Sequence, residues 1–368
     1  MDKEKGRVST SSRPNVKVGI SIGDVNGISP EVIMKALGDS RMMLDCTPII
    51  YGSSKVFSFH KKRMNYEESK NSFSYVLCEF ADKAKSKAVN LIDIWKDELK
   101  FDLGNATAEG GKYAFESLER ATQDLASGKI DVLVTAPINK EAMGKSGFKF
   151  PGHTEYLADL AGQEEALMLM ISPTLRVGLV TSHIPIKEVS AAVTTDKVLD
   201  KLKAFNSSLK KDFGIRKPKI AVFGLNPHAG ENGKMGAEEN ESIHPAISKA
   251  NNEGIMAFGP FPADGFFGSS ARSQYDGVLA MYHDQGLSAF KALSFDEGVN
   301  FTAGLPIIRT SPDHGTAYDI VGQNKASGDS MRNAIYLAVD VFRTHLMEKE
   351  VNVNPLAISE KKDRRKER

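Results

Sequence analysis

Short apolar and β-branched runs recur along the chain, each followed by turn-forming residues, and they predict buried parallel strands. These runs are residues 16–24, 46–53, 130–137, 175–183, 218–227 and 275–284. Between them, apolar residues return with the 3.6-residue period of a helix. The helical segments are residues 30–37, 109–126, 187–209 and 240–253. Because strands and helices alternate, the pattern predicts an α/β fold.

The polar loops of this pattern follow the carboxyl ends of the predicted strands. Open α/β sheets bind ligands there, because strand ends leave a crevice lined by loops and helix N-termini. No Gly-, Ser- or Pro-rich linker marks a boundary, so we expect two interleaved α/β lobes with the active site in the cleft between them. Residues 60–75 are too polar for a core and are predicted to form a surface excursion between Phe59 and Val76.

The composition is that of an ordinary globular protein with room for two lobes, since 41% of the 368 residues are hydrophobic. Lys and Arg number 48 against 47 Asp and Glu, so net charge gives no reason to expect nucleic acid or a membrane surface as a partner. The two cysteines, Cys46 and Cys78, do not have the number or spacing of a disulfide framework or a thiolate metal site.

The ends of the chain show no targeting signal. Residues 1–15 contain charge and Ser but no apolar run of signal-peptide length, and no later stretch reaches about 20 apolar residues. We therefore expect a cytoplasmic protein. Residues 1–15 and the last ten residues, 359–368, lack apolar periodicity and are expected to be disordered, the latter within a charged C-terminal tail of residues 349–368.

Three histidines, His183, His228 and His283, end three predicted strands in turn-forming contexts. A single histidine at such a place is more often a structural residue whose neutral ring is hydrogen-bonded locally. Three in the same topological position favour a metal site, because imidazole is a common metal ligand and catalytic zinc sites use three protein ligands. The open fourth position would bind and acidify a substrate hydroxyl.

His153 and Thr154 follow a glycine, and Glu155 begins a predicted helix. Two interpretations are equally supported. In one, Thr154 or His153 caps the helix by accepting a hydrogen bond from a free amide. In the other, the amides, the hydroxyl and the ring bind an anion such as phosphate, which helix N-termini favour.

Lys291, Asn300 and Arg309 lie downstream of the last predicted strand. Isolated cations are usually solvated surface charges. Arg309, however, follows the apolar run LPII and precedes turn residues, so we expect its guanidinium at a strand end. There it can bind a carboxylate or phosphate, while Lys291 can bind the same anion or act as an acid or base.

Taken together, eight segments resemble the 4-hydroxythreonine-4-phosphate dehydrogenase family, and the resemblance extends over about residues 16–346. In order they are GDVNGISPE, GHTEYLADLAG, TSHIP, GLNPHAGENGKMGAEE, GPFPAD, AMYHDQGL, FDEGVN and GLPIIRTSPDHGTAYDIVG. The family has the fold of the isocitrate and isopropylmalate dehydrogenases, whose Gly-Asp segment and HG[ST]A loop resemble Gly23-Asp24 and residues 314–317 here. That fold does not use the Gly-x-Gly-x-x-Gly fingerprint, so its absence here does not exclude a nicotinamide cofactor.

The resemblance implies a homodimeric enzyme with one divalent metal ion per active site. At least one metal ligand would come from the neighbouring subunit, and zinc, cobalt and magnesium are all open. The ligands would be His183, His228 and His283. The substrate would bind His153, Thr154, Lys291, Asn300 and Arg309. The adenosine end of NAD, or of NADP, would lie against His314, Gly315, Thr316 and Ala317.

The implied reaction is NAD-dependent oxidation of 4-phosphooxy-L-threonine in pyridoxal 5′-phosphate biosynthesis. The product, 2-amino-3-oxo-4-phosphooxybutanoate, loses CO2 to give 3-amino-2-oxopropyl phosphate. The base is open between Lys291 and a carboxylate near the metal, Asp264 or Asp284, although each aspartate also fits a helix cap or turn.

The resemblance also divides the chain. A nucleotide-binding lobe is predicted from residues 16–136 and 290–348, and a metal-binding and dimerisation lobe from residues 137–289. Three other activities fit the same motifs. A paralogous dehydrogenase would act on D-threonate or D-erythronate 4-phosphate or on a dihydrodiol carboxylate, a metal-dependent phosphohydrolase would release phosphate without a nicotinamide, and a silent metabolite-binding protein would do neither.

Overall fold

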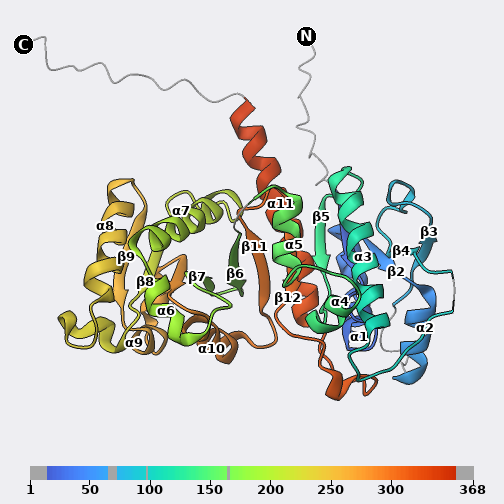
Figure 1. Cartoon of the computed structure of the whole chain (residues 1–368). Helices are drawn as coiled ribbons and strands as arrows, with labels where there is room; N and C mark the ends of the chain where they lie inside the picture. The colour runs from blue at the N-terminus through green and yellow to red at the C-terminus, as the bar shows by residue number, and fades with distance from the viewer. Residues whose placement is uncertain (1–14, 65–72, 97, 164–165, 354–368) are drawn as a thin grey trace, which may run out of the picture.

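The computed structural model describes residues 15–64, 73–96, 98–163 and 166–353, whose strands form one twisted sheet of 12 strands (Figure 1). In spatial order the strands are β3 (Val76–Cys78), β4 (Asn90–Asp93), β2 (Cys46–Gly52), β1 (Val16–Ser21), β5 (Val132–Thr135), β12 (Arg309–Pro312), β11 (Val299–Ala303), β6 (Leu167–Ile171), β7 (Arg176–Leu179), β10 (Gly277–Ala280), β8 (Lys219–Phe223) and β9 (Met256–Phe261). All six predicted strands are present and form two parallel groups, β2, β1 and β5 in one and β7, β10 and β8 in the other, which confirms the α/β fold.

The middle of the sheet is antiparallel, which the sequence did not predict. Strand β11 runs antiparallel to both β12 and β6, and β6 runs antiparallel to β7. Three successive reversals make the parallel strands β7, β10, β8 and β9 run opposite to the parallel strands on the other side. The central strands join the two halves, and residues after β5 of one half and after β7 and β10 of the other line one cavity.

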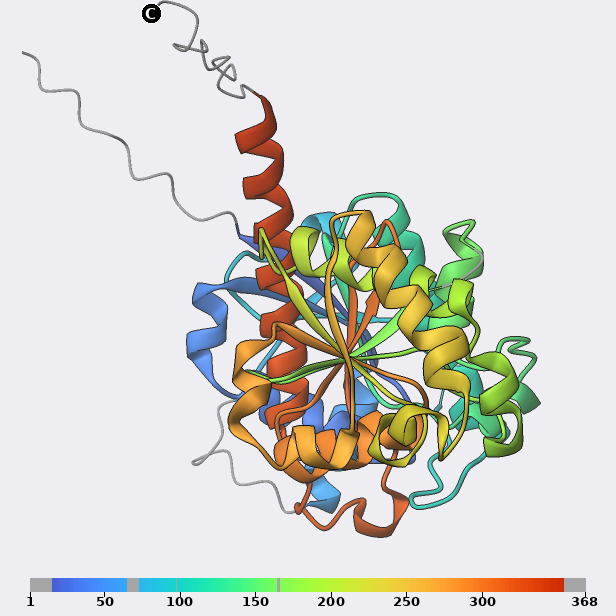
Figure 2. The same cartoon turned by 90° about the vertical axis from the view of Figure 1, so that its left-hand side faces the viewer.

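Helices cover both faces of the sheet (Figures 1 and 2). They are α1 (Ser29–Leu37), α2 (Ser54–Arg63), α3 (Ala108–Ala126), α4 (Lys140–Lys145), α5 (His153–Leu160), α6 (Ile186–Ala192), α7 (Thr195–Lys211), α8 (His244–Asn252), α9 (Ala263–Phe267), α10 (His283–Ser294) and α11 (Asp329–Val353). No helix in the described part of the chain is long and apolar enough to cross a membrane.

Along the central strands, alternate side chains point toward the hydrophobic core and toward the opposite face, which holds the candidate site. On β6, Leu167, Leu169 and Ile171 belong to the hydrophobic core, whereas Met168 and Met170 between them line a cavity on the opposite face. Successive side chains of a strand point to opposite faces, so this division follows from the strand itself.

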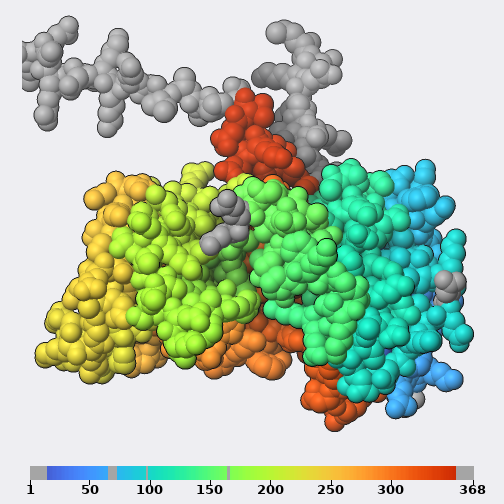
Figure 3. All heavy atoms as spheres, in the orientation of Figure 1, coloured from blue at the N-terminus to red at the C-terminus, as the bar shows by residue number. Residues whose placement is uncertain are grey.

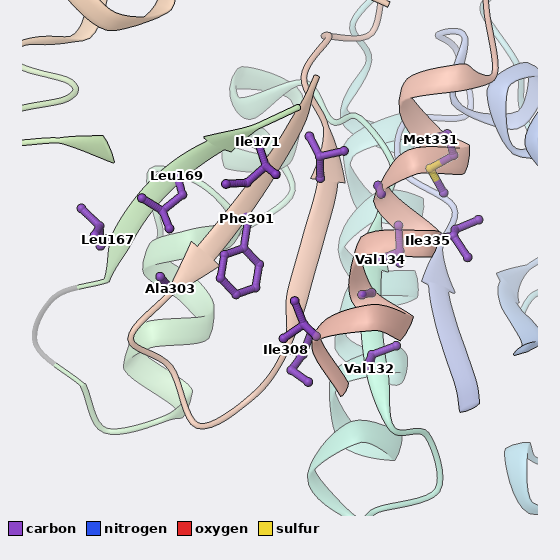
Figure 4. Close-up of a cluster of buried hydrophobic side chains, with 14 of the residues drawn as sticks. Val132, Val134, Leu167, Leu169, Ile171, Phe301, Ala303, Ile308, Met331 and Ile335 are labelled. Atoms are coloured by element: carbon purple, nitrogen blue, oxygen red, sulfur yellow. The ribbon is translucent and has the colours of Figure 1, made fainter. Parts of the chain in front are cut away.

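The core side of the same strands packs against α11. Phe301 of β11 lies among the labelled side chains of Figure 4 together with Val134 of β5 and Ile335 of α11. Phe301 is 2% exposed, and burying such a side chain contributes about 1.5–3 kcal/mol. The long helix therefore supports the central strands from behind and leaves their other face available for a site.

The predicted surface excursion at residues 60–75 is wrong where the structure describes it. Helix α2 continues to Arg63, and His60, Met64 and Phe73 are all buried. The His60 ring lies 2.8 Å by its Nε2 from the Val25 carbonyl oxygen, and burial lowers the pKa of His60 to about 4. Residues 65–72 lie outside the described residues.

Three predicted boundaries also change. The helix predicted over 187–209 is two helices, because the chain breaks at Val193 and Thr194 caps α7 by accepting a hydrogen bond from the Lys197 amide. The expected C-terminal tail begins later than residue 349, since α11 continues to Val353. At the other end, Asn15 donates a hydrogen bond to Thr47. Residues 1–14 and 354–368 lie outside the described residues.

Candidate active site

A cavity of about 250 Å³ lies over the central strands, between the two halves of the molecule. In the space-filling view the halves meet side by side, and orange atoms of the segment after β10 are visible between them at the lower edge (Figure 3). The cavity brings together most of the predicted site residues. They are His153, Thr154, His183, His283, Lys291, Asn300, Arg309, His314 and Gly315.

Arg309 is the buried cation of this cavity. It begins β12 and is only 3% exposed, since its side chain lies between β5 and β11. Its guanidinium donates to Thr135 at 3.0 and 2.6 Å, to Thr302 at 3.1 Å and to His153 at 3.1 Å. Burial lowers the pKa of Arg309 to about 10, so the group is still charged at neutral pH. Because these partners are neutral, the positive charge is available to an anion in the cavity.

The bond from Arg309 fixes the tautomer of His153. Arginine can only donate, so Nδ1 of His153 accepts and the ring proton lies on Nε2. Nε2 is buried without a partner in the described structure, and the same is true of Oδ1 of Asn300. Burial, reinforced by the charges of Arg309 and Lys140, holds the pKa of His153 well below its usual value. His153 is therefore a neutral donor whose partner would be a bound ligand.

Thr154 lies directly beside this donor, in the first turn of α5. The Gly152 that precedes the helix makes no side-chain cap, so neither His153 nor Thr154 acts as the helix cap. The capping interpretation of this segment is wrong. The amides of the first turn of α5 have no partner within the helix, and they lie at the end of the helix that lines the cavity.

Lys291 lies on the opposite side of the cavity, on α10, next to a carboxylate that the sequence analysis missed. Its Nζ is 3.4 Å from Oδ1 of Asp313 and donates to the Asp313 carbonyl at 3.3 Å. Burial raises the pKa of Asp313, although the nearby ammonium opposes the shift. Asp313 immediately precedes His314 in the SPDHG segment, so its position next to a predicted cofactor loop was the available signal.

Lys140 was also missed. It begins α4, five residues after β5, and lines the cavity with its side chain close to Gly152. Its charge contributes to the lowered pKa values of both His153 and His183, after the larger effect of burial. The cavity therefore has three cations, Lys140, Lys291 and Arg309, facing one another from different elements.

His183 and His283 lie at the open side of the cavity. Their ring centroids are 5.9 Å apart, which brings together two of the predicted metal ligands from β7 and β10. The Nδ1 of His283 lies 2.6 Å from Oδ1 of Asp284. A carboxylate on one ring nitrogen leaves the other as the ligand atom, and this arrangement is typical of metal-binding histidines.

His228 lies elsewhere. It lines a second cavity, of about 470 Å³, together with Asp264 in the first turn of α9. Within the described residues no three His, Cys, Asp or Glu side chains form a group that could hold a metal ion. One chain thus supplies two neighbouring histidines in the main cavity and a third that lines another cavity, and the three-histidine site stays a prediction.

The predicted cofactor loop is tied to the N-terminal Gly-Asp segment. The Ile28 amide donates to the Thr316 carbonyl at 2.9 Å, and a Cβ on Gly27 would lie 2.6 Å from that oxygen, so only glycine fits there. Next to it, Tyr318 donates to the Asp24 carboxylate at 2.5 Å, and Ala317 has a left-handed backbone with φ of 40°. His314 and Gly315 face the main cavity, whereas Thr316 and Ala317 pack against this N-terminal turn.

Comparison with known proteins identifies the family. The profile described as "Pyridoxal phosphate biosynthetic protein PdxA" matches residues 44–338. The chain belongs to the PdxA family. A 4-hydroxythreonine-4-phosphate dehydrogenase of Bacteroides thetaiotaomicron is 48% identical over 342 residues, which cover 93% of each chain. A protein of Oceanobacillus iheyensis named "Putative D-threonate 4-phosphate dehydrogenase" is 40% identical and covers 89% of this chain and 98% of its own.

Solved structures agree with this placement in the PdxA family. The 4-hydroxythreonine-4-phosphate dehydrogenase of Klebsiella pneumoniae is 33% identical, with a TM-score of 0.76 over 91% of this chain and 100% of that one. A terephthalate dihydrodiol dehydrogenase from Burkholderia xenovorans, at 24% identity and a TM-score of 0.58, shares the fold.

Proposed function

We propose that this PdxA-family chain oxidises 4-phosphooxy-L-threonine with NAD as hydride acceptor, in the formation of pyridoxal 5′-phosphate. The observation that carries the proposal is the buried cradle of Arg309 and His153, which opens into the same cavity as the His183 and His283 pair. It is supported by the curated relatives named 4-hydroxythreonine-4-phosphate dehydrogenase.

The phosphate of the substrate would bind at the buried end of the cavity. Arg309 supplies the charge, His153 donates from Nε2, and Thr154 donates at the start of α5. Lys140 adds a second positive charge from the cavity wall. These contacts would place the carbinol carbon of the substrate toward the histidine pair, because the phosphate end is fixed.

A divalent metal ion fits the other end of the cavity, since two imidazoles lie side by side and Asp284 already binds the distal nitrogen of one. His183 and His283 of one chain would hold the ion with His228 of a second copy, so the proposed enzyme is a homodimer. When bound, the ion would lower the pKa of the substrate hydroxyl. Zinc, cobalt and magnesium are the candidates.

Lys291 is the group that we assign to the proton of that hydroxyl. Of the three earlier candidates, Asp264 lies in the other cavity and Asp284 is largely exposed and bound to His283, whereas Lys291 lies in the main cavity against Asp313. To act as this base, Lys291 would first have to lose its own proton to solvent, and its neutral amine would then accept the hydroxyl proton. NAD, when bound, would supply the hydride acceptor for C3. The β-keto acid that results then loses CO2.

A second candidate is oxidation of D-threonate 4-phosphate, and the 40% identical Oceanobacillus protein favours it. Both substrates carry a phosphate and a secondary alcohol, so the Arg309 cradle serves either. They differ at the amino group, which only one of them has.

The test is a substrate panel on the purified full-length chain. 4-Phosphooxy-L-threonine, D-threonate 4-phosphate and D-erythronate 4-phosphate are each assayed with NAD and NADP, after chelation and re-addition of zinc, cobalt or magnesium. We expect reduced cofactor to form fastest with 4-phosphooxy-L-threonine and NAD. Faster turnover of a threonate or erythronate phosphate would move the assignment to the second candidate, and phosphate release without a nicotinamide would overturn it.

A further inference from the structure

The segment that carries His228 has an unusual backbone. Five consecutive residues, His228 to Asn232, have positive φ, with values between 43° and 77°. Four of the five are not glycine, and left-handed backbone is sterically unfavourable for L-residues with a Cβ. Strained backbone of this kind persists only where its surroundings enforce it, and it is concentrated at functional sites.

The buried carboxylate of Glu239 enforces this turn. Glu239 is 2% exposed, and its Oε1 accepts hydrogen bonds from the amides of Leu225 and Asn226, both at 2.7 Å. Its Oε2 accepts from the Asn226 side chain at 3.0 Å. Glu239 thereby binds the chain immediately before His228.

Glu239 also contacts the turn itself. A Cβ on Gly230, in the middle of the left-handed stretch, would lie 2.5 Å from Oε2 of Glu239, and a Cβ on Gly224 would lie 3.0 Å from Oε1. At both positions a side chain would crowd the carboxylate, so glycine is required there. Glu239 lies in a short π-helical turn before α8, a feature often found at functional sites.

A second contact connects this turn to the other histidines. Gln285, two residues after His283, accepts from the Met281 amide at 2.7 Å and donates to the Gly224 carbonyl at 2.7 Å. The end of β8, which leads to His228, is thereby bound to the end of β10, which leads to His283. The position of one histidine segment thus depends on the other.

We propose that Glu239 is a positioning residue, whose buried carboxylate binds residues 225–226, holds the left-handed turn 228–232 that follows them and so fixes where the His228 imidazole is presented. Glu239 does not touch the substrate, and it acts through the backbone of the turn. The inference rests on the proposed function of His228 as a metal ligand. The hold of Glu239 on residues 225–232, called the clamp below, can be measured without metal or substrate.

The experiment compares Glu239→Ala, Glu239→Gln and, as a control, Glu241→Gln, which removes an exposed carboxylate from the same turn. Hydrogen exchange is measured on the metal-free full-length chain. We expect exchange of the Leu225 and Asn226 amides to become at least tenfold faster in Glu239→Ala. Glu239→Gln should be intermediate, because a side-chain amide oxygen can still accept both bonds, and Glu241→Gln should match the wild type.

Turnover then tests the positioning role. In Glu239→Ala we expect kcat to fall at least tenfold while KM for the phosphorylated substrate changes less than twofold, because the Arg309 end is intact, and Glu239→Gln should regain part of kcat. Unchanged amide exchange in Glu239→Ala would overturn the clamp, and faster exchange with unchanged kcat would overturn the positioning role. Failure of the proposed function would differ from both, since wild-type protein would then show no turnover.

A double variant distinguishes loss of the Glu239 contact from general misfolding. Gly230→Ala places a methyl against Oε2 of Glu239, so alone it should accelerate exchange across residues 225–232. Combined with Glu239→Ala, the clash with the carboxylate is removed while the cost of a Cβ on left-handed backbone remains, so we expect the effects of the two changes on exchange to be less than additive. Additive effects of the two changes would show that the glycine and the carboxylate act independently and would contradict the clamp.

Discussion

The two ends of the main cavity are built in opposite ways. At one end, Arg309 and His153 are buried and hydrogen-bonded to each other, and Arg309 also donates to Thr135 and Thr302, so the residues of the proposed anion cradle are held in place within one chain. At the other end, His183 is exposed, His283 is partly exposed, and His228 lies in another cavity on a strained turn.

Under the proposed function, the two ends differ in what they need from outside the chain. The anion end would need only its ligand, because Arg309 is already hydrogen-bonded to Thr135 and His153. The histidine end has two imidazoles in one cavity and a third that lines another cavity, and we infer that a second copy of the chain completes it.

The largest effect is expected from mixing two inactive variants. His228→Ala and His283→Ala should each lose nearly all activity, since each removes a proposed ligand from every site. Unfolding and refolding them together gives mixed dimers in half of the population, and each mixed dimer has one intact site. Activity should therefore return to about a quarter of the wild-type value.

The control for this mixture is His183→Ala with His283→Ala. Both substitutions fall on the same side of the proposed interface, so mixed dimers have no intact site and activity should stay lost. Recovery in the control as well, or none in the first mixture, would show that His228 does not act across the interface. Sedimentation of each mixture checks that dimers are present.

At the cradle end, Arg309→Met should cost about 3 kcal/mol of transition-state stabilisation, on the order of 100-fold in kcat/KM, because a charged hydrogen-bond donor to the phosphate is lost. The matched control is Arg176→Met, which removes another partly buried arginine whose guanidinium lies over Phe213 outside the main cavity. If both variants lose activity in proportion to their loss of melting temperature, the effect is stability and the cradle has no special role.

Much of this site could be predicted from the sequence. Local motifs identified residues of the main cavity, because a polar residue after an apolar run is expected at a strand end, and this expectation does not depend on how the strands pair. The three strand-end histidines and Arg309 were chosen in this way, and His183, His283 and Arg309 line the cavity, although Arg309 begins β12 and the apolar run before it is not a strand.

What could not be predicted was long-range pairing. Strand β6 reads LMLMI, and such a uniformly apolar run does not reveal which side chains face the cavity. Its antiparallel partner β11 lies about 130 residues later, and no local pattern specifies that contact. The same limit explains His60, whose polar surroundings in sequence hid a buried ring, and the separation of His228 from the other two histidines.

The buried histidine of the cradle gives a pH prediction. The pKa of His153 is lowered on folding, so between that value and about 6.5 the unfolded chain binds a proton that the folded chain does not. Stability therefore falls as pH drops below about 6.5, by at most about 1.4 kcal/mol per pH unit for this residue. His153→Gln should flatten the fall in unfolding free energy between pH 7 and pH 5, measured by urea titration.

The protonation state of the His153 ring gives a second test of the neutral cradle. Nuclear magnetic resonance of labelled histidine rings gives a second measurement, in which His153 should keep its proton on Nε2 at pH 5.5. A doubly protonated His153 ring at that pH would contradict the neutral cradle.

The smallest effect is expected where the cofactor loop meets the N-terminal turn. Tyr318→Phe removes the hydroxyl that donates to Asp24, a buried carboxylate whose pKa is raised by desolvation. Losing one such bond is worth about 1 kcal/mol, so KM for NAD should rise about fivefold, while kcat stays within twofold because the cradle and the histidines are untouched. The control is Tyr336→Phe, which removes a phenol from a different cavity, next to Phe213. The KM of this variant for NAD should not change. Two outcomes would contradict this: an equal rise of KM for NAD in both variants, or a fall in kcat with KM for NAD unchanged. Either would mean that the Asp24 contact does not hold the cofactor loop and that the Gly-Asp turn serves folding alone.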